Sequence, residues 1–134
     1  MLSQVSIYAE NKKGTFQSIT HILACENINI LGSVTNDSAE YGIIRMIVSD
    51  PKRAIPALEK EGYLCREVVV LGVEIEDTPG SLNQLLQALL DSNINIDYLY
   101  LAFNRDSGKP IMVLHTDDVL EVKDCLQVKG FCVL

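Results

Sequence analysis

The sequence predicts an α+β protein made of two copies of one β-α-β-β-α-β unit. The first observation is a repeat, because NKKGTFQSITHILACENINI at residues 11–30 resembles DTPGSLNQLLQALLDSNINI at residues 77–96. The second is that period-two apolar patterns alternate along the chain with apolar residues at helical spacing. The third is that glycine, proline and asparagine separate these segments at matching places in both copies. The two copies therefore share one order of elements.

In the first copy, residues 4–9 alternate as a strand, and Gly14 and Thr15 open a helix with an apolar stripe of Phe16, Ile19, Ile22 and Leu23. Residues 28–36 and 41–49 are predicted strands around a turn at residues 37–40. The next helix, 50–62, has Asp50 as its cap and Pro51 at its first position, where proline is tolerated. Pro56 removes an early hydrogen bond of that helix. Residues 63–70 form the fourth strand.

In the second copy, residues 71–77 alternate as a strand, and the Pro79–Gly80 pair ends it. Ser81 can cap a helix with leucines at helical spacing. Residues 94–103 are rich in β-branched and aromatic residues and form a strand, and 104–110 form a hairpin turn. Then come a strand at 111–116, a helix with Asp117 or Asp118 near its cap and Gly130 at its end, and a short strand at 131–134.

The order β-α-β-β-α-β is the ferredoxin-like arrangement, in which a four-stranded antiparallel sheet carries two helices on one face. The predicted units are residues 1–70 and 71–134, with the boundary near Leu71–Gly72. About 65 residues bury only a marginal core. Because no Ser/Gly linker separates the copies, we expect the two tandem sandwiches to pack directly.

Charge and hydropathy exclude several classes of function. The net charge is −7, with −1 in residues 1–70 and −6 in residues 71–134, so nucleic acid is a poor partner. No apolar run is long enough to cross a membrane. The N-terminus lacks the basic and apolar segments of a secretory signal. We therefore expect a cytoplasmic protein without a nucleic-acid or membrane partner.

The loop before the second copy's leucine-rich helix has the chemistry of an amino-acid site. A helix N-terminus carries unpaired N–H groups and partial positive charge, which suit a carboxylate. Gly80 allows close approach of a ligand to the backbone. Asp77 is placed to accept hydrogen bonds from an ammonium group. Alternatively, Gly14 and Gly80 only permit a tight turn, Asp77 and Ser81 only cap the helix, and the asparagines only end helices.

EDTPGSL with NINID in the second copy, and AENKKGTF with NINIL in the first, resemble the ACT domain, a small-molecule regulatory module, over essentially the whole chain. The resemblance implies that amino acids bind where one unit's loop meets the strand start of a neighbour, with the loop at 77–82 facing residues 29–30 or the loop at 11–16 facing 95–96. The implied ligand-binding residues are Asp77, Thr78, Pro79, Gly80, Ser81, Leu82, Asn95, Ile96, Asn11, Gly14, Thr15, Phe16, Asn29 and Ile30.

The two loops are unequal. The first has Asn11 where the second has Asp77, and Lys13 where the second has Pro79. Asn11 can still accept from an ammonium group, and the lysines beside it could engage a carboxylate. The intact D-x-P-G motif favours the second loop as the binding site.

Neither a catalytic nor a metal-binding pattern is present, so we expect no enzyme, no cofactor and no metal. His21 and His115 have no matching histidine in the other copy, and the four cysteines form no C-x-x-C pair. The main hypothesis is a regulatory protein that binds a small amino acid, forms a homodimer and modulates a metabolic enzyme. The alternative is a ligand-free assembly module. A ferredoxin-like acylphosphatase ranks last, because neither loop contains the arginine that its phosphate cradle needs.

Overall fold

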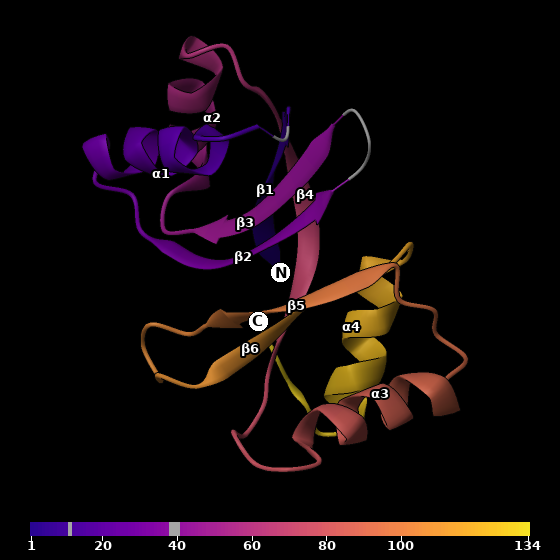
Figure 1. The fold of residues 1–134 in the computed structure, drawn as a ribbon. Coiled ribbons are helices and arrows are strands. Elements are labelled where there is room, and N and C mark those ends of the chain that lie inside the picture. Colours follow the sequence, from indigo (N-terminus) through magenta and orange to yellow (C-terminus); the bar gives the residue numbers. More distant parts are fainter. Residues whose placement is uncertain (11, 38–40) are drawn as a thin grey trace. The chain divides into compact units, whose positions relative to one another are not determined.

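The computed structural model describes residues 1–10, 12–37 and 41–134, and the described residues form four helices and seven strands (Figure 1). The predicted turn at 37–40 lies largely outside the described residues. In chain order the elements are β1 Leu2–Ala9, α1 Thr15–Cys25, β2 Ile30–Asp37, β3 Gly42–Val48, α2 Pro51–Lys60, β4 Leu64–Glu74, α3 Ser81–Asp91, β5 Tyr98–Phe103, β6 Pro110–His115, α4 Val119–Val128 and β7 Cys132–Val133. The α+β class is confirmed.

The described chain divides into two compact units. The first unit is Ser3–Val68, and the second is Val69–Leu134 with Met1–Leu2. One strand, β4, runs from Leu64 to Glu74 without interruption. The prediction of two strands meeting near Leu71 was therefore wrong at this point. Valines and Leu71 fill residues 68–71, and this β-branched run contains no residue that ends a strand.

In the first unit, β3 pairs antiparallel with both β1 and β2, with Val5 opposite Met46 and Val34 opposite Arg45. β1 also pairs with β4. In the second unit the strand order is β5-β6-β4-β7, and all three pairings are antiparallel. A self-contained four-stranded sheet in each unit stays a prediction, because β4 spans the boundary between the units.

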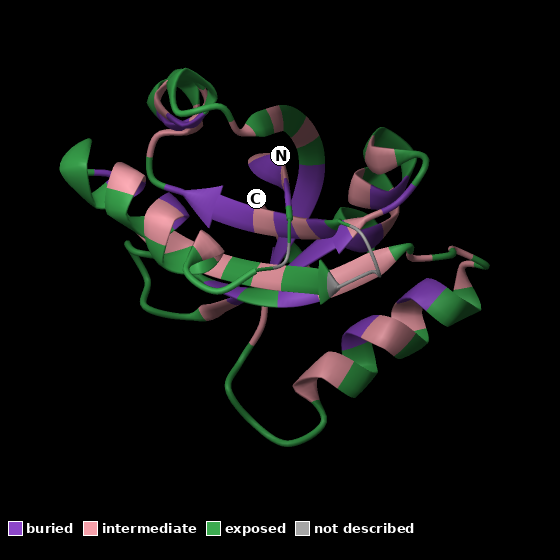
Figure 2. Cartoon of the chain, turned by 45° about the horizontal axis from the view of Figure 1, so that its top comes forward, coloured by how far each residue is buried: buried purple, intermediate pink, exposed green. Residues whose placement is uncertain are grey.

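Each unit has its own apolar core between its helices and one face of its strands. In the first, alternate residues of β1 and β3 pack with Ile19 and Leu23 of α1 and Leu58 of α2. In the second, β4 and β6 pack in the same way with Leu85 of α3 and Leu126 of α4. Figure 2 shows both buried and exposed residues along the helices, as expected of amphipathic helices.

The helix caps settle two sequence predictions. Asp50 accepts a hydrogen bond from the Arg53 amide at 3.3 Å and caps α2, which contains Pro56. Asp118, not Asp117, caps α4 and accepts from the Glu121 amide at 3.0 Å.

Among the described residues, no helix combines the length and the apolar character needed to span a membrane.

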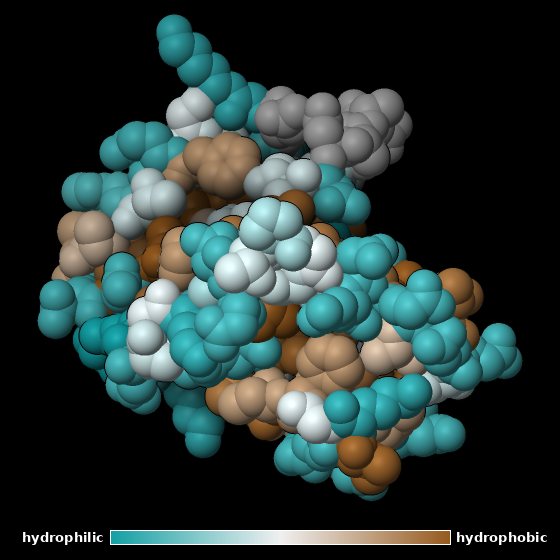
Figure 3. All heavy atoms as spheres, turned by 90° about the horizontal axis from the view of Figure 1, so that it is seen from below, coloured by the Kyte–Doolittle hydropathy of each residue, from teal (hydrophilic) through white to brown (hydrophobic). Residues whose placement is uncertain are grey.

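On the face in Figure 3, hydrophilic residues predominate and hydrophobic residues lie between them. Several large apolar side chains are nevertheless exposed, including Leu101 and Phe103 of β5. These two belong to the candidate site.

Candidate functional site

The start of α3 lacks a side-chain cap. The N-cap residue is Gly80, with φ of +90°, and no side chain accepts a hydrogen bond there. The prediction that Ser81 or Asp77 caps the helix was therefore wrong. Ser81 is already the first helical residue, and its hydroxyl lies 2.8 Å from that of Thr78. The Ser81 amide donates to the Thr78 carbonyl at 3.2 Å, so the first turn of α3 keeps its partial positive charge without a side-chain acceptor.

Gly80 is required by its backbone conformation. A Cβ added there would meet no atom within 4 Å, but φ of +90° is strained for any residue with a side chain. Gly14 has the same φ at the start of α1. The backbone conformation of both glycines fits a tight turn, with open space above the backbone at each position. That the turn is their only role stays a prediction.

A cavity of about 510 Å³ lies at the start of α3, within the second unit. Its volume is in the range typical of small-ligand pockets. It brings together four of the predicted site residues, and its lining consists of Ile75, Glu76, Asp77, Thr78, Ser81, Leu82, Leu101, Phe103, Gly108, Pro110 and Met112. Asp77 is exposed at this cavity, whereas Pro79 and Gly80 lie in the loop but do not line it.

The apolar side of the cavity comes from β5 and β6. Leu101 lies opposite Met112 and Phe103 lies opposite Pro110 in the antiparallel register. Leu101 and Phe103 remain 50% and 56% exposed. The sequence analysis assigned these residues to strands without a role in the site. A signal was available, because two large apolar residues here replace Thr35 and Asp37 of the first copy.

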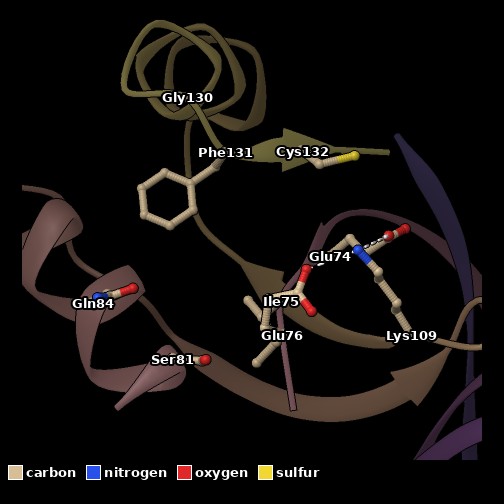
Figure 4. A pocket seen from close by; sticks show the side chains of 9 residues that line it. All are labelled: Glu74, Ile75, Glu76, Ser81, Gln84, Lys109, Gly130, Phe131 and Cys132. Carbon is tan, nitrogen blue, oxygen red and sulfur yellow. Dashed lines mark hydrogen bonds and ion pairs between the residues drawn. The ribbon is translucent and has the colours of Figure 1, made fainter. Parts of the chain in front are cut away.

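A second hollow of about 270 Å³ also borders Ser81, and Figure 4 shows its lining. Lys109 reaches toward the end of β4, with its Nζ 2.8 Å from Glu76 Oε1 and 3.9 Å from Glu74 Oε1. Phe131 lies across the hollow from them (Figure 4). The hydrogen bond to Glu76, with the charges of both glutamates, raises the pKa of Lys109 above its ordinary value. Sequence analysis missed this cluster, since Lys109 is 33 residues from Glu76 in the sequence.

At the start of α1, Gly14 has nearly the same φ and ψ as Gly80, and a cavity of about 370 Å³ borders Glu10, Lys12 and Thr15. Thr15 Oγ1 donates to the Glu10 carbonyl at 3.0 Å. The hollow that corresponds to the 510 Å³ cavity has about 20 Å³ and is lined by Phe16 and Thr35 among others, which is room for about one water. Lys12 Nζ lies 3.7 Å from Glu10, both side chains being exposed. Asn11 lies outside the described residues.

The NINI segments lie at the opposite ends of their helices. Asn27 and Asn93 have φ of 57° and 56°, so they end α1 and α3 in the left-handed conformation, as the helix-terminating interpretation predicts. Asn95 is exposed, and Ile96 packs against the core. α3 has 11 residues and is about 16 Å long. Asn95 and Ile96 therefore do not line the cavity at the start of α3.

In the first copy, Asn29 is likewise exposed, and its amide donates to Ser49 Oγ at 2.9 Å. Ile30 packs against the first core. The role of residues 29–30 and 95–96 at a neighbouring loop stays a prediction.

Neither histidine lies at these cavities. His115 Nδ1 lies 2.8 Å from Asp97 Oδ2, and its ring stacks on Tyr98 with centroids 5.0 Å apart. His21 is exposed on α1, 3.6 Å from the Cys25 sulfur. Over the part of the chain that the structure describes, no group of three or more metal-ligating side chains occurs.

Comparison with known proteins identifies the family. The model of the ACT domain pair matches residues 1–131. Protein BT0572 from Bacteroides thetaiotaomicron is similar over 99% of this chain and 91% of its own, with 31% identity and a TM-score of 0.89. The regulatory subunit of aspartate kinase from Thermus thermophilus, in its ligand-free form, is similar over 93% and 87%, with 16% identity and a TM-score of 0.67.

Aspartokinase alpha and beta subunits are similar over 94% of this chain and 95% of theirs, with 15% identity and a TM-score of 0.59. At these identities the two kinase structures support the fold alone. No curated protein matches the chain. The family match over residues 1–131, together with the similarity to protein BT0572, shows that this chain belongs to the ACT-domain-pair family.

Proposed function

We propose that this chain is a non-enzymatic regulatory protein that binds an amino acid at the start of α3. In this proposal, residues 1–70 and 71–134 are two ferredoxin-like ACT units, each with a four-stranded sheet. The second unit binds the ligand, and the first has lost that capacity. The observation that carries the proposal is the cavity of about 510 Å³ beside the uncapped start of α3.

The polar residues at that cavity match the two charges of an amino acid. The first turn of α3 attracts a carboxylate, because its N–H groups and the helix dipole point toward the loop. Asp77 is exposed and lines the same cavity, so its carboxylate can accept hydrogen bonds from an ammonium group. The Thr78 and Ser81 hydroxyls add neutral hydrogen-bonding groups.

We further propose a homodimer that acts on a metabolic enzyme. Membership of the ACT-domain-pair family supports a regulatory role, and two structures of the same fold are an aspartate kinase regulatory subunit and aspartokinase subunits. A ligand changes assembly only by binding one state more tightly than another. The assembly state must therefore depend on ligand concentration if this mechanism operates.

A ligand-free assembly module is the second candidate. It is favoured by the exposure of Leu101 and Phe103, since an interface between copies would cover such side chains. The two candidates make different predictions. An assembly module has one oligomeric state whatever amino acid is added, whereas a sensor changes its stability or its assembly with one ligand.

The test is a thermal-shift screen of the purified protein against the twenty amino acids. A ligand at 100 times its dissociation constant stabilises by about 2.7 kcal/mol, which raises Tm by several degrees for a chain of this size. Asp77→Ala should abolish the selective shift. Asp124→Ala is the matched control, because Asp124 is an exposed aspartate of α4 that lines neither cavity. A flat screen would favour the assembly module.

A further inference from the structure

The apolar side of the α3 cavity extends well beyond what the head group of an amino acid needs. Two register pairs, Leu101 with Met112 and Phe103 with Pro110, form adjacent rows across β5 and β6. Leu82 of α3 and Ile75, which follows β4, line the same cavity. The cavity thus has an acidic, hydroxyl-bearing region at the loop and a large apolar region on the strands.

The fold does not explain the exposed part of this apolar region. The corresponding residues of the first copy, 66 positions earlier, are Thr35 and Asp37. The first unit forms β2 through these positions without a large apolar side chain at either. Leu101 and Phe103 are about half exposed, so they contribute little to the core of the second unit. Binding of another molecule over Leu101 and Phe103 would be favourable, because it would bury their apolar surface.

The charges at the cavity act against an acidic ligand side chain. Glu76 and Asp77 line it, and they repel an additional carboxylate. Lys109 does not line it and is paired with Glu76 at 2.8 Å. A polar ligand side chain that lies on Leu101 and Phe103 would lose water without gaining a hydrogen-bonding partner there.

We propose that the ligand of the second unit is an amino acid with a large apolar side chain. This inference rests on the proposed function and adds the ligand class. The α-carboxylate lies at the first turn of α3, the ammonium group at Asp77, and the side chain on the surface formed by Leu82, Leu101, Phe103 and Met112. The cavity of about 510 Å³ has room for both parts of such a ligand.

The experiment measures dissociation constants by calorimetry for alanine, 2-aminobutyrate, norvaline and norleucine, followed by leucine, phenylalanine, serine and aspartate. Each added CH₂ that becomes buried should tighten binding about fourfold, so norleucine should bind about 60-fold more tightly than alanine. Serine and aspartate should bind more weakly than alanine or should not bind. Equal affinity along the series, or tightest binding of a polar amino acid, would overturn the ligand class and leave amino-acid binding intact.

Three variants separate the parts of the site. Leu101→Thr and Phe103→Asp introduce the first copy's residues at exposed positions, so both should fold, and both should weaken the dependence of affinity on chain length. Asp77→Asn should weaken the binding of every ligand by a similar factor, and the affinity should still increase with the length of the ligand side chain. Leu90→Thr, at a leucine of α3 that is 70% exposed and outside the cavity, is the control.

Two further outcomes would overturn the proposed ligand class. If no amino acid binds, both the proposed function and this inference are wrong. If, in addition, Leu101→Thr dissociates an oligomer that the unmodified chain forms without ligand, the apolar surface is an interface between copies.

Discussion

Asn104 Nδ2 donates a hydrogen bond of 2.9 Å to Glu74 Oε2 and thereby ties the β5–β6 turn to the end of β4. The Asn104 Oδ1 atom also accepts from the amides of Asp106 and Ser107, at 3.0 and 3.4 Å. One side chain therefore holds the turn that carries Gly108 and Pro110 to the edge of the ligand cavity. Asn104 and Glu74 are 30 residues apart in the sequence.

Asn104→Ala should lower the free energy of unfolding by about 1–3 kcal/mol, because it removes three hydrogen bonds of a half-buried side chain. Lys109→Met removes the ion pairs of an exposed lysine in the same turn, with Glu76 at 2.8 Å and with the 14% exposed Glu74 at 3.9 Å. Ion pairs of an exposed lysine contribute little in water. Urea denaturation of both variants gives the comparison. Equal losses of stability in the two variants would show that Asn104 has no special role in this turn.

Gly80→Ala should destabilise the protein by about 1–2 kcal/mol, because it places a Cβ on a residue with φ of +90°. Gly14→Ala should have a similar cost, since its φ and its open surroundings are the same. Asparagine tolerates this conformation better than alanine, so Gly80→Asn should lose less stability. Chemical denaturation measures all three. An Asn variant as unstable as the Ala variant would contradict the explanation by backbone strain.

Asp118→Ala should cost about 1 kcal/mol of stability, because Asp118 caps α4 through the Glu121 amide. Asp117→Ala changes the net charge equally but removes no cap, so its effect should stay within about 0.5 kcal/mol. The two variants are compared by thermal or urea unfolding at one pH. A larger loss from Asp117→Ala would contradict the capping geometry.

Cys65 should react slowly with iodoacetamide in the folded protein. Burial, with a smaller effect of Glu59, raises the pKa of its thiol to about 11. At pH 8 about one thiol in a thousand is then ionised, and the thiolate is the reactive form. The rate should therefore rise about tenfold per pH unit and level off near pH 11. Peptide mapping by mass spectrometry follows each cysteine. The exposed Cys25 and Cys132 provide the comparison, and a fast reaction of Cys65 at pH 8 would contradict this prediction.

Much of the secondary structure could be predicted because local signals repeat in the two copies. Apolar spacing identified the helices, Asp50 and Pro51 marked the start of α2, and the first asparagine of each NINI segment ended α1 and α3. The continuity of β4 was missed because the repeat boundary looked like a strand end. Ser81 was misread as a cap because sequence alone does not show that Gly80 takes the N-cap conformation.

Only the part of the candidate site that lies in a single loop could be predicted from the sequence. Asp77, Thr78, Ser81 and Leu82 lie within six residues, and a single loop brings them together. Leu101 and Met112 reach the same cavity through the register of β5 and β6, which strand patterns do not determine. The large difference in volume between the hollow beside Leu82 and the corresponding hollow beside Phe16 also depends on side-chain packing.

The measurement that tests the central claim most directly is an amide chemical-shift titration of the labelled protein with the amino acid that gives the largest thermal shift. We predict saturable changes at residues 75–84 and at the cavity residues of β5 and β6. The corresponding residues of the first unit, 12–18 and 33–36, should change little. Changes confined to the first unit's loop, or no saturable change at the start of α3, would contradict the assignment of the site.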